Sequence, residues 1–154
     1  ILDEPTVAVD AQSRKFILDG IKNLADNGAS ILYTTHYLDE AEYLCNKISI
    51  MDNGKNILTG DMQTLINGVS VKEKITVVGY IKPEIISILE NQDDVVDVEV
   101  KENQVTLNYS NDVGNIKRLI HLLDDNNVVY EEIFSKKPKL EDIFLEMTGK
   151  ELRE

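Results

Sequence analysis

Cysteine and long hydrophobic runs are both scarce in this chain of 154 residues. Its single cysteine, Cys45, cannot form a disulfide within the chain, which fits a reducing cytosol. No apolar stretch approaches the ~20 residues that a membrane-crossing helix needs, so no transmembrane segment is predicted. Hydrophobic residues make up 42% of the chain and charged residues 29%, which is typical of a soluble globular protein with one ordinary domain or two small ones.

Positive charge is also in short supply. The chain carries 16 lysines and arginines against 28 aspartates and glutamates, a formal net charge of -12. Such a surface repels nucleic acid and anionic lipid headgroups unless basic residues gather locally. The densest basic cluster, Lys136, Lys137 and Lys139, is of a size that usually marks a solvated turn. We therefore expect no nucleic-acid partner.

Helical and strand patterns alternate over the first half of the chain. Ile17, Ile21 and Leu24 recur at spacings of four and three, which predicts one inward face of a helix. The run Asp52-Asn53-Gly54 predicts a tight hairpin. The predicted elements are a helix over 13–27, a short buried parallel strand over 30–35, an acidic helix over 38–46, hairpin strands over 47–51 and 55–59, and a helix over 61–67.

The pattern changes in the second half, where strands and helices follow the order β-α-β-β-α-β and a tail helix ends the series. This order is typical of a ferredoxin-like sandwich, in which two helices cover one face of a sheet. The opposite face is predicted to be wet or to meet a polar partner, because it carries Asp97, Glu99, Lys101, Thr106 and Asn108. The predicted elements are a strand over 74–80, a helix from Pro83, strands over 96–101 and 105–109, a helix over 112–126, a strand over 128–134 and a helix over 140–147.

Residues 68–72 lack strong periodicity and make the best boundary between these halves. The predicted domains are 1–68 and 73–148, with a tail over 149–154. The opening run, Ile1-Leu2 followed by Asp3-Glu4-Pro5, is typical of the end of a strand. We therefore expect the chain to be a piece of a longer protein.

Two adjacent carboxylates, Asp3 and Glu4, follow that first strand. Ligands of open α/β sheets bind at the carboxyl ends of the strands, where both side chains would lie. There Asp3 can hold Mg²⁺, usually through water, and Glu4 can orient a water for attack on a terminal phosphate. Taken alone, two acids are more often the start of a surface loop.

Features further along the chain favour the catalytic interpretation. Pro5-Thr6 follows the acids directly, and Asp10 stands at the entry to the next helix. His36 follows the second strand, so a right-handed parallel crossover would bring it beside Glu4. An imidazole there can donate to a γ-phosphate oxygen as charge develops. The acids of the following helix, Asp39, Glu40 and Glu42, are predicted to form a solvated face and not a metal cluster.

Taken together, residues 1–55 resemble the nucleotide-binding domain of ABC transporters. Ile1-Leu2-Asp3-Glu4 is similar to the end of the Walker B motif, residues 5–14 to the D-loop stretch, and Thr34-Thr35-His36 to the switch-histidine loop. The resemblance implies that Asp3 organises the Mg²⁺ shell, Glu4 is the catalytic carboxylate and His36 senses the γ-phosphate of ATP. It also implies that Asp10 reaches across a dimer that sandwiches the nucleotide.

The resemblance sets expectations for the whole protein. The fold is expected to be α/β, the C-terminal piece of a P-loop NTPase-type sheet followed by the ferredoxin-like α+β domain. The protein is expected to hydrolyse ATP with Mg²⁺, to pair with a membrane permease and a second ATPase subunit, and to lie on the cytoplasmic face of the membrane. Because the chain has no Gly-x-x-x-x-Gly-Lys-[Ser/Thr] and no signature segment, we expect it to be inactive alone.

Three other interpretations stay open. The ferredoxin-like domain, which resembles an accessory domain of some transporter ATPases, can act as a small-molecule-sensing or dimerisation module. A DNA-repair or chromosome-associated ABC ATPase shares the motif set, but the acidic surface and the second domain argue against it. A helicase Asp-Glu box is disfavoured because Pro5-Thr6 and the His36 loop follow.

Overall fold

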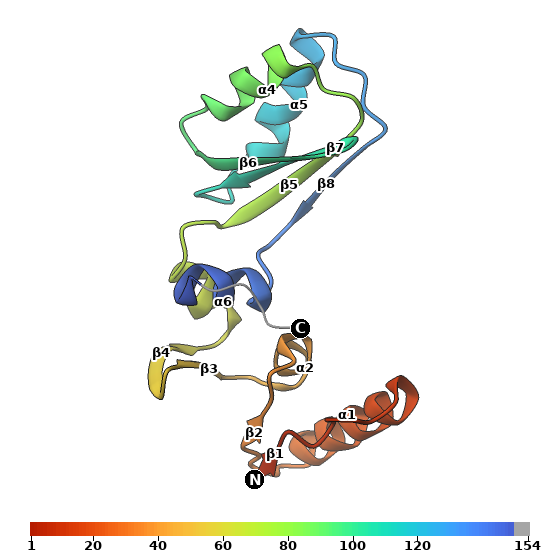
Figure 1. Ribbon diagram of the computed structural model, residues 1–154, viewed down its shortest axis with the longest axis vertical. Helices are drawn as coiled ribbons and strands as arrows, with labels where there is room; N and C mark the ends of the chain where they lie inside the picture. Colours follow the sequence, from red (N-terminus) through yellow and green to blue (C-terminus); the bar gives the residue numbers. More distant parts are fainter. Residues whose placement is uncertain (150–154) are drawn as a thin grey trace. The chain divides into compact units, whose positions relative to one another are not determined.

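The computed structural model describes residues 1–149, which form mixed α/β structure with three separate sheets (Figure 1). The chain divides into two compact units, Ile1–Leu65 and Ile66–Glu154. The predicted mixed α/β class is confirmed, while the predicted tail over 149–154 lies outside the described residues apart from Gly149. The elements are β1 (Leu2–Asp3), α1 (Ala11–Asp26), β2 (Tyr33–Thr34), α2 (Leu38–Leu44), β3 (Ile48–Asp52), β4 (Lys55–Gly60), α3 (Met62–Asn67), β5 (Glu73–Val78), α4 (Pro83–Glu90), β6 (Val95–Lys101), β7 (Gln104–Tyr109), α5 (Asn115–Asp125), β8 (Glu132–Lys136) and α6 (Leu140–Thr148).

The first unit begins with a β-α-β crossover. Strands β1 and β2 pair in parallel, with Leu2 opposite Tyr33 and Asp3 opposite Thr34. The predicted parallel pairing is therefore confirmed. The prediction of a buried strand over 30–35 is wrong in length and burial, since β2 has two residues and Leu32 is 61% exposed. The cause is that this sheet has only two strands in the described chain, so β2 lacks the cover of a larger sheet.

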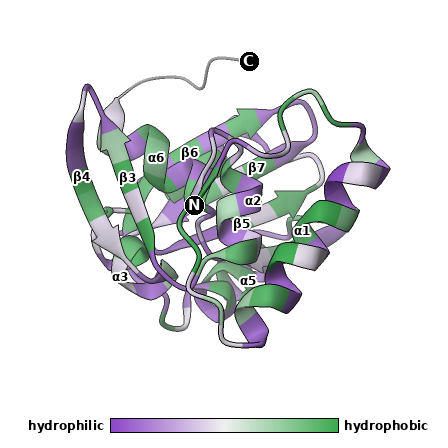
Figure 2. Cartoon of the chain, turned by 90° about the horizontal axis from the view of Figure 1, so that it is seen from below, coloured by the Kyte–Doolittle hydropathy of each residue, from purple (hydrophilic) through white to green (hydrophobic). Residues whose placement is uncertain are grey.

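Helix α1 starts two residues before the predicted position. Asp10 is its N-cap, and the carboxylate accepts hydrogen bonds from the next turn. The helix ends before Gly28, whose φ of +93° suits glycine. Of the predicted inward face, Ile21 is buried but Leu24 is 59% exposed. Figure 2 shows hydrophobic and hydrophilic residues alternating along α1.

The predicted hairpin of the first unit is confirmed. Strands β3 and β4 pair antiparallel around Asn53 and Gly54, whose φ values of 49° and 73° are both positive. Positive φ at both turn residues is the geometry of the tight hairpin turn that Asn-Gly favours. Asp61 then caps α3 as predicted, because its carboxylate accepts from the amide of Thr64 at 2.7 Å.

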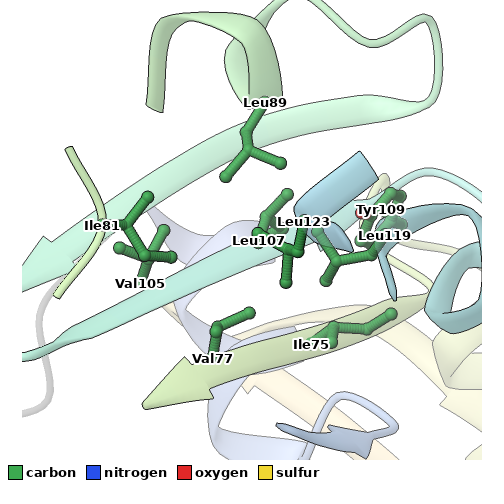
Figure 3. Packing of buried hydrophobic residues seen from close by; sticks show 9 residues of the cluster. All are labelled: Ile75, Val77, Ile81, Leu89, Val105, Leu107, Tyr109, Leu119 and Leu123. Atoms are coloured by element: carbon green, nitrogen blue, oxygen red, sulfur yellow. The ribbon is translucent and has the colours of Figure 1, made fainter. Parts of the chain in front are cut away.

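The second unit is built on a four-stranded antiparallel sheet in the order β6-β7-β5-β8. Helices α4 and α5 lie on one face of it (Figure 1). Alternate residues of the two central strands face these helices and form the core, which Figure 3 shows from close by. The buried cluster comprises Ile75, Val77, Ile81, Leu89, Val105, Leu107, Tyr109, Leu119 and Leu123.

Three predicted details of the second unit are wrong. A register shift between Val95 and Asp97 breaks the alternation of β6, so Val96 is 47% exposed. Helix α5 begins only at Asn115, after Gly114 with its φ of 71°, which leaves Val113 outside the helix. Strand β8 starts at residue 132 and not at 128, because the preceding residues close the end of α5.

The opposite face of this sheet is polar, but not uniformly wet. Thr76 and Thr106 share a hydrogen bond of 2.9 Å, and Lys74 pairs with Asp142 of α6 at 2.6 Å. Asn108, predicted to be wet or to meet a polar partner, is 5% exposed, and its amide donates to Glu99 Oε1 at 3.4 Å. Among the described helices, none is long and apolar enough to cross a membrane.

Candidate functional site

The first unit brings Glu4 and His36 together. Each follows one strand of the parallel pair, and Nδ1 of His36 lies 3.1 Å from Oε1 of Glu4. The amide of Glu4 donates to the carbonyl of Thr34 at 3.0 Å, which ties the two strand ends together. Both side chains are about half exposed, His36 at 55% and Glu4 at 48%, so a ligand can reach them.

Glu4 also has an unusual backbone. Its φ of 43° lies in the left-handed region, which costs a residue other than glycine on the order of 1 kcal/mol. The carbonyl of Glu4 accepts from the amide of Val7 at 3.2 Å, so the residue opens a tight turn. The turn directs the chain away from β1 immediately after the acid.

Asp3 lies beside Glu4 at the same strand end, and its carboxylate accepts a hydrogen bond from the hydroxyl of Thr34. Exposed carboxylate oxygens are ligands that Mg²⁺ takes, with water and phosphate oxygens completing its octahedron. Within residues 1–149, no cluster of three or more His, Cys, Asp or Glu side chains could cage a metal. The residues present thus fit an ion held through one or two carboxylates and water.

Asp10 has a different environment from the other three predicted site residues. Its Oδ1 accepts from the amides of Gln12 and Ser13, each at 3.0 Å. These bonds, the one from Ser13 foremost, lower the pKa of Asp10. None of the hydrogen bonds in the described chain joins Asp10 to Asp3, Glu4 or His36. Its contact across a dimer stays a prediction, and its carboxylate caps the N-terminus of α1.

The structure adds one residue that the sequence reasoning missed. Glu40 of α2 was predicted to belong to a solvated face, but it is 1% exposed, whereas the side chain of Asp39 is 78% exposed. A buried carboxylate is stable only if it is paired and hydrogen-bonded. Four donors satisfy it: Oε1 accepts from Thr6 Oγ1 at 2.7 Å and Arg14 Nε at 2.5 Å, and Oε2 from Tyr33 Oη at 2.6 Å and Thr35 Oγ1 at 3.0 Å.

These contacts shift the ionisation of the cluster. Burial alone would raise the pKa of Glu40, but its hydrogen bonds, led by that from Tyr33, hold the pKa below its ordinary value. Burial and then the bond to Glu40 raise the pKa of Tyr33 to about 12. The hydrogen bond to Glu40 raises the pKa of Arg14. The cluster therefore holds an ionised carboxylate against a cation and a neutral phenol.

Aromatic contacts connect the same cluster to His36. The guanidinium carbon of Arg14 lies 4.1 Å from the ring centroid of Tyr37, close enough for a cation–π interaction. The ring of Tyr37 lies 4.1 Å from that of His36 at an interplanar angle of 39°. The ring of Tyr37 thus contacts both the guanidinium of the buried ion pair and the imidazole.

Comparison with known proteins gives relatives over the whole chain. No family model matches it. The chain is 34% identical to the linearmycin resistance ATP-binding protein LnrL of Bacillus subtilis, over 100% of the chain and 50% of that protein. It is 28% identical to the Nod factor export ATP-binding protein I of Ralstonia nicotianae, over 100% of the chain and 47% of that protein. It is 32% identical to the daunorubicin resistance ATP-binding protein DrrA2 of Streptomyces coeruleorubidus, over 96% of the chain and 47% of that protein.

The chain thus spans about half the length of the curated relatives that it matches. These relatives are ATP-binding proteins of ABC transporters. The resemblance seen in residues 1–55 is therefore confirmed, and it extends over the whole chain.

Proposed function

We propose that this chain is part of an ATP-binding subunit of an ABC transporter, which hydrolyses ATP to drive transport through a membrane permease. The observation that carries the proposal is the 3.1 Å contact between His36 and Glu4 at the carboxyl ends of two parallel strands. Similarity to ATP-binding proteins over the full chain supports it. Because two of those relatives are named for resistance and one for export, we propose export as the direction of transport.

Each site residue has a proposed role. Glu4 orients the attacking water, and His36 donates to the γ-phosphate as charge develops there. Asp3 holds the water shell of Mg²⁺, which when bound neutralises charge on the phosphate oxygens. Because Nδ1 of His36 faces Glu4, Nε2 is the ring nitrogen that is left to donate to the phosphate.

The chain alone is proposed to bind ATP weakly and to hydrolyse it negligibly. Its sequence has no phosphate-binding loop of the Gly-x-x-x-x-Gly-Lys-[Ser/Thr] type to hold a phosphate opposite Asp3 and Glu4. Catalysis of phosphoryl transfer depends mostly on positioning and electrostatics, so the site accelerates hydrolysis little when the phosphate is not held in place. We propose that a second ATPase subunit, which Asp10 contacts, and a permease complete the assembly on the cytoplasmic face of the membrane.

We further propose that the functional domains are 1–68 and 73–148, and that the second is a ferredoxin-like accessory domain. Its β-α-β-β-α-β element order and its antiparallel strand order β6-β7-β5-β8 support this assignment. The same domain offers a second candidate function as a sensing or dimerisation module. That candidate predicts that deleting residues 73–148 changes ligand response or subunit pairing but leaves Glu4-dependent hydrolysis in place.

The decisive experiment measures ATP hydrolysis by the full-length protein that carries this sequence. Wild type is compared with Glu4→Gln and with a control, Glu84→Gln, which removes an exposed first-turn carboxylate from α4. We expect Glu4→Gln to lose activity, the control to keep it, and residues 1–154 alone to show none. Unchanged activity in Glu4→Gln would remove this residue from catalysis and overturn the proposal.

A further inference from the structure

Glu40 joins the two chain segments that carry Glu4 and His36. One donor, Thr6, lies two residues after Glu4, and another, Thr35, directly precedes His36. We infer that Glu40 is a positioning residue that fixes the distance between the water-orienting carboxylate and the imidazole. The inference rests on the proposed function and adds a residue that acts through both members of its catalytic pair.

The two carboxylate oxygens divide between the two segments. Oε1 accepts from Thr6 and Arg14, which belong to the turn after β1 and to α1. Oε2 accepts from Tyr33 and Thr35, which belong to β2 and the residue after it. Because a carboxylate is rigid and planar, a group that binds one segment through each oxygen fixes the spacing of the two. The amide of Glu4 also donates to the carbonyl of Thr34 at 3.0 Å, and Glu40 adds side-chain contacts beyond that strand end.

At this position Glu40 meets donors on both sides. An ionised carboxylate has only acceptors, about four lone-pair sites, which matches four donors. Glutamine has the same shape, but its single carbonyl oxygen must face Arg14, which can only donate, so its N–H groups face the hydroxyls of Tyr33 and Thr35. Glu40→Gln therefore removes the charge and reverses the hydrogen bonds to one segment while it conserves volume.

A second contact reaches His36 through aromatic rings. Arg14, held by Oε1 of Glu40, lies over Tyr37, whose ring packs on His36. The amide of Tyr37 also donates to Thr35 Oγ1 at 2.9 Å, so the hydroxyl that binds Glu40 orients the start of α2. Loss of Glu40 would therefore release the imidazole from two directions.

The test uses the full-length protein with three shape-conserving changes, Glu40→Gln, Thr6→Val and Thr35→Val. The measured quantities are kcat, KM for ATP and the folded fraction of the first unit from amide hydrogen exchange, with Glu84→Gln as the control. We expect each change to lower kcat on the order of tenfold or more, because small misplacement of reacting groups has effects of that size. We expect KM to change by less than about threefold, since the groups that grip nucleotide are elsewhere. The double variant Thr6→Val/Thr35→Val should lose less than the product of the two single losses, since both hydroxyls act through the same carboxylate.

Several results would overturn the inference. These are an unchanged kcat in all three variants, a kcat that falls only as far as the folded fraction falls, or losses that multiply in the double variant. If Glu40→Gln does not fold, the two threonine variants, each of which removes a single hydroxyl, still decide the matter. An active wild type with an inactive Glu4→Gln and an unchanged kcat in Glu40→Gln and both threonine variants rejects this inference alone. If instead Glu4→Gln stays active, the proposed function fails, and this inference fails with it.

Discussion

Truncation of Glu40 to alanine is the perturbation for which the structure gives the clearest magnitude. The change removes one acceptor shared by four donors from two segments of the first unit. Because Glu40 is 1% exposed and Thr6 is 2% exposed, water cannot readily take over the lost bonds. The alanine variant thus leaves a cation and several hydroxyls without their partner in a largely enclosed space.

The size of the effect follows from these contacts. Removing one partner of a buried ion pair costs about 3–5 kcal/mol, because the other charge stays uncompensated. The side chain of Arg14 is 27% exposed and lies 3.7 Å from Asp39, so it can turn toward that carboxylate and solvent. The unsatisfied hydroxyl of Thr6 adds about 1 kcal/mol or more. We therefore expect the free energy of unfolding of the first unit to fall by about 3 kcal/mol.

Amide hydrogen exchange in the full-length protein is the appropriate assay. The chain forms two compact units, so a single global unfolding midpoint would mix transitions. Exchange reports the opening free energy of β1, β2 and α2 separately from that of the second unit. Glu84→Ala, an exposed first-turn position of α4, is the matched control and should stay within about 0.5 kcal/mol of wild type.

A loss below about 1 kcal/mol in α2 and β2 would refute the reasoning, because surface ion pairs contribute that little. The same conclusion would follow if the loss spread equally over both units. Glu40→Gln should fall between wild type and alanine, because its carbonyl oxygen keeps an acceptor for one segment.

Three further predictions concern the first unit. The pKa of Glu40 is lowered from 4.5 by folding, so its stabilisation is fully present above pH 4.5 and is lost as pH falls through the lower folded value. The opening free energies of β2 and α2, measured by amide hydrogen exchange, should therefore decline more steeply below pH 4.5 in wild type than in Glu40→Gln. Asp10→Ala should destabilise α1 by about 1 kcal/mol and Asp10→Ser by less, as measured by exchange in its first turn, and equal losses would refute the capping role. Gly54→Ala, at a φ of 73°, should destabilise the hairpin by about 1 kcal/mol. Gly20→Ala should instead stabilise α1 by about 0.5–1 kcal/mol, because the added methyl group has nothing within 4 Å in this helix. Denaturant unfolding measures both changes.

The features that were predictable from sequence are those that depend on neighbouring residues. Asn53-Gly54 fixes a tight hairpin, and Pro83 begins α4 at its first position. The predicted helix over 140–147 is α6, which ends at Gly149 with its φ of 62°. The contact between Glu4 and His36 could also be predicted, since a right-handed crossover brings the ends of parallel strands together.

The errors come from interactions over a longer range. The register shift in β6 depends on how its residues pair with β7, and an alternating run of valines contains no sign of it. The late start of β8 has a similar cause. The amide of Val128 donates to the carbonyl of Leu123 at the end of α5. The apolar residues after α5 therefore close that helix and do not extend the strand. Strand propensity alone cannot predict whether these residues close α5 or extend β8.

Glu40 illustrates why a charge pattern can mislead about which side chains are buried. Acids near a helix N-terminus are common, since they complement the helix dipole without needing a partner. The sequence pattern therefore predicts that such acids are exposed. Yet Glu40 lies four residues before Leu44, on the helical face that includes the apolar positions of α2. A carboxylate at an inward position must be matched by donors from other elements, here Arg14 in particular. An acid on the apolar face of a short helix therefore predicts a basic partner on a neighbouring element, and in this chain that partner lies on α1, the helix that follows Glu4.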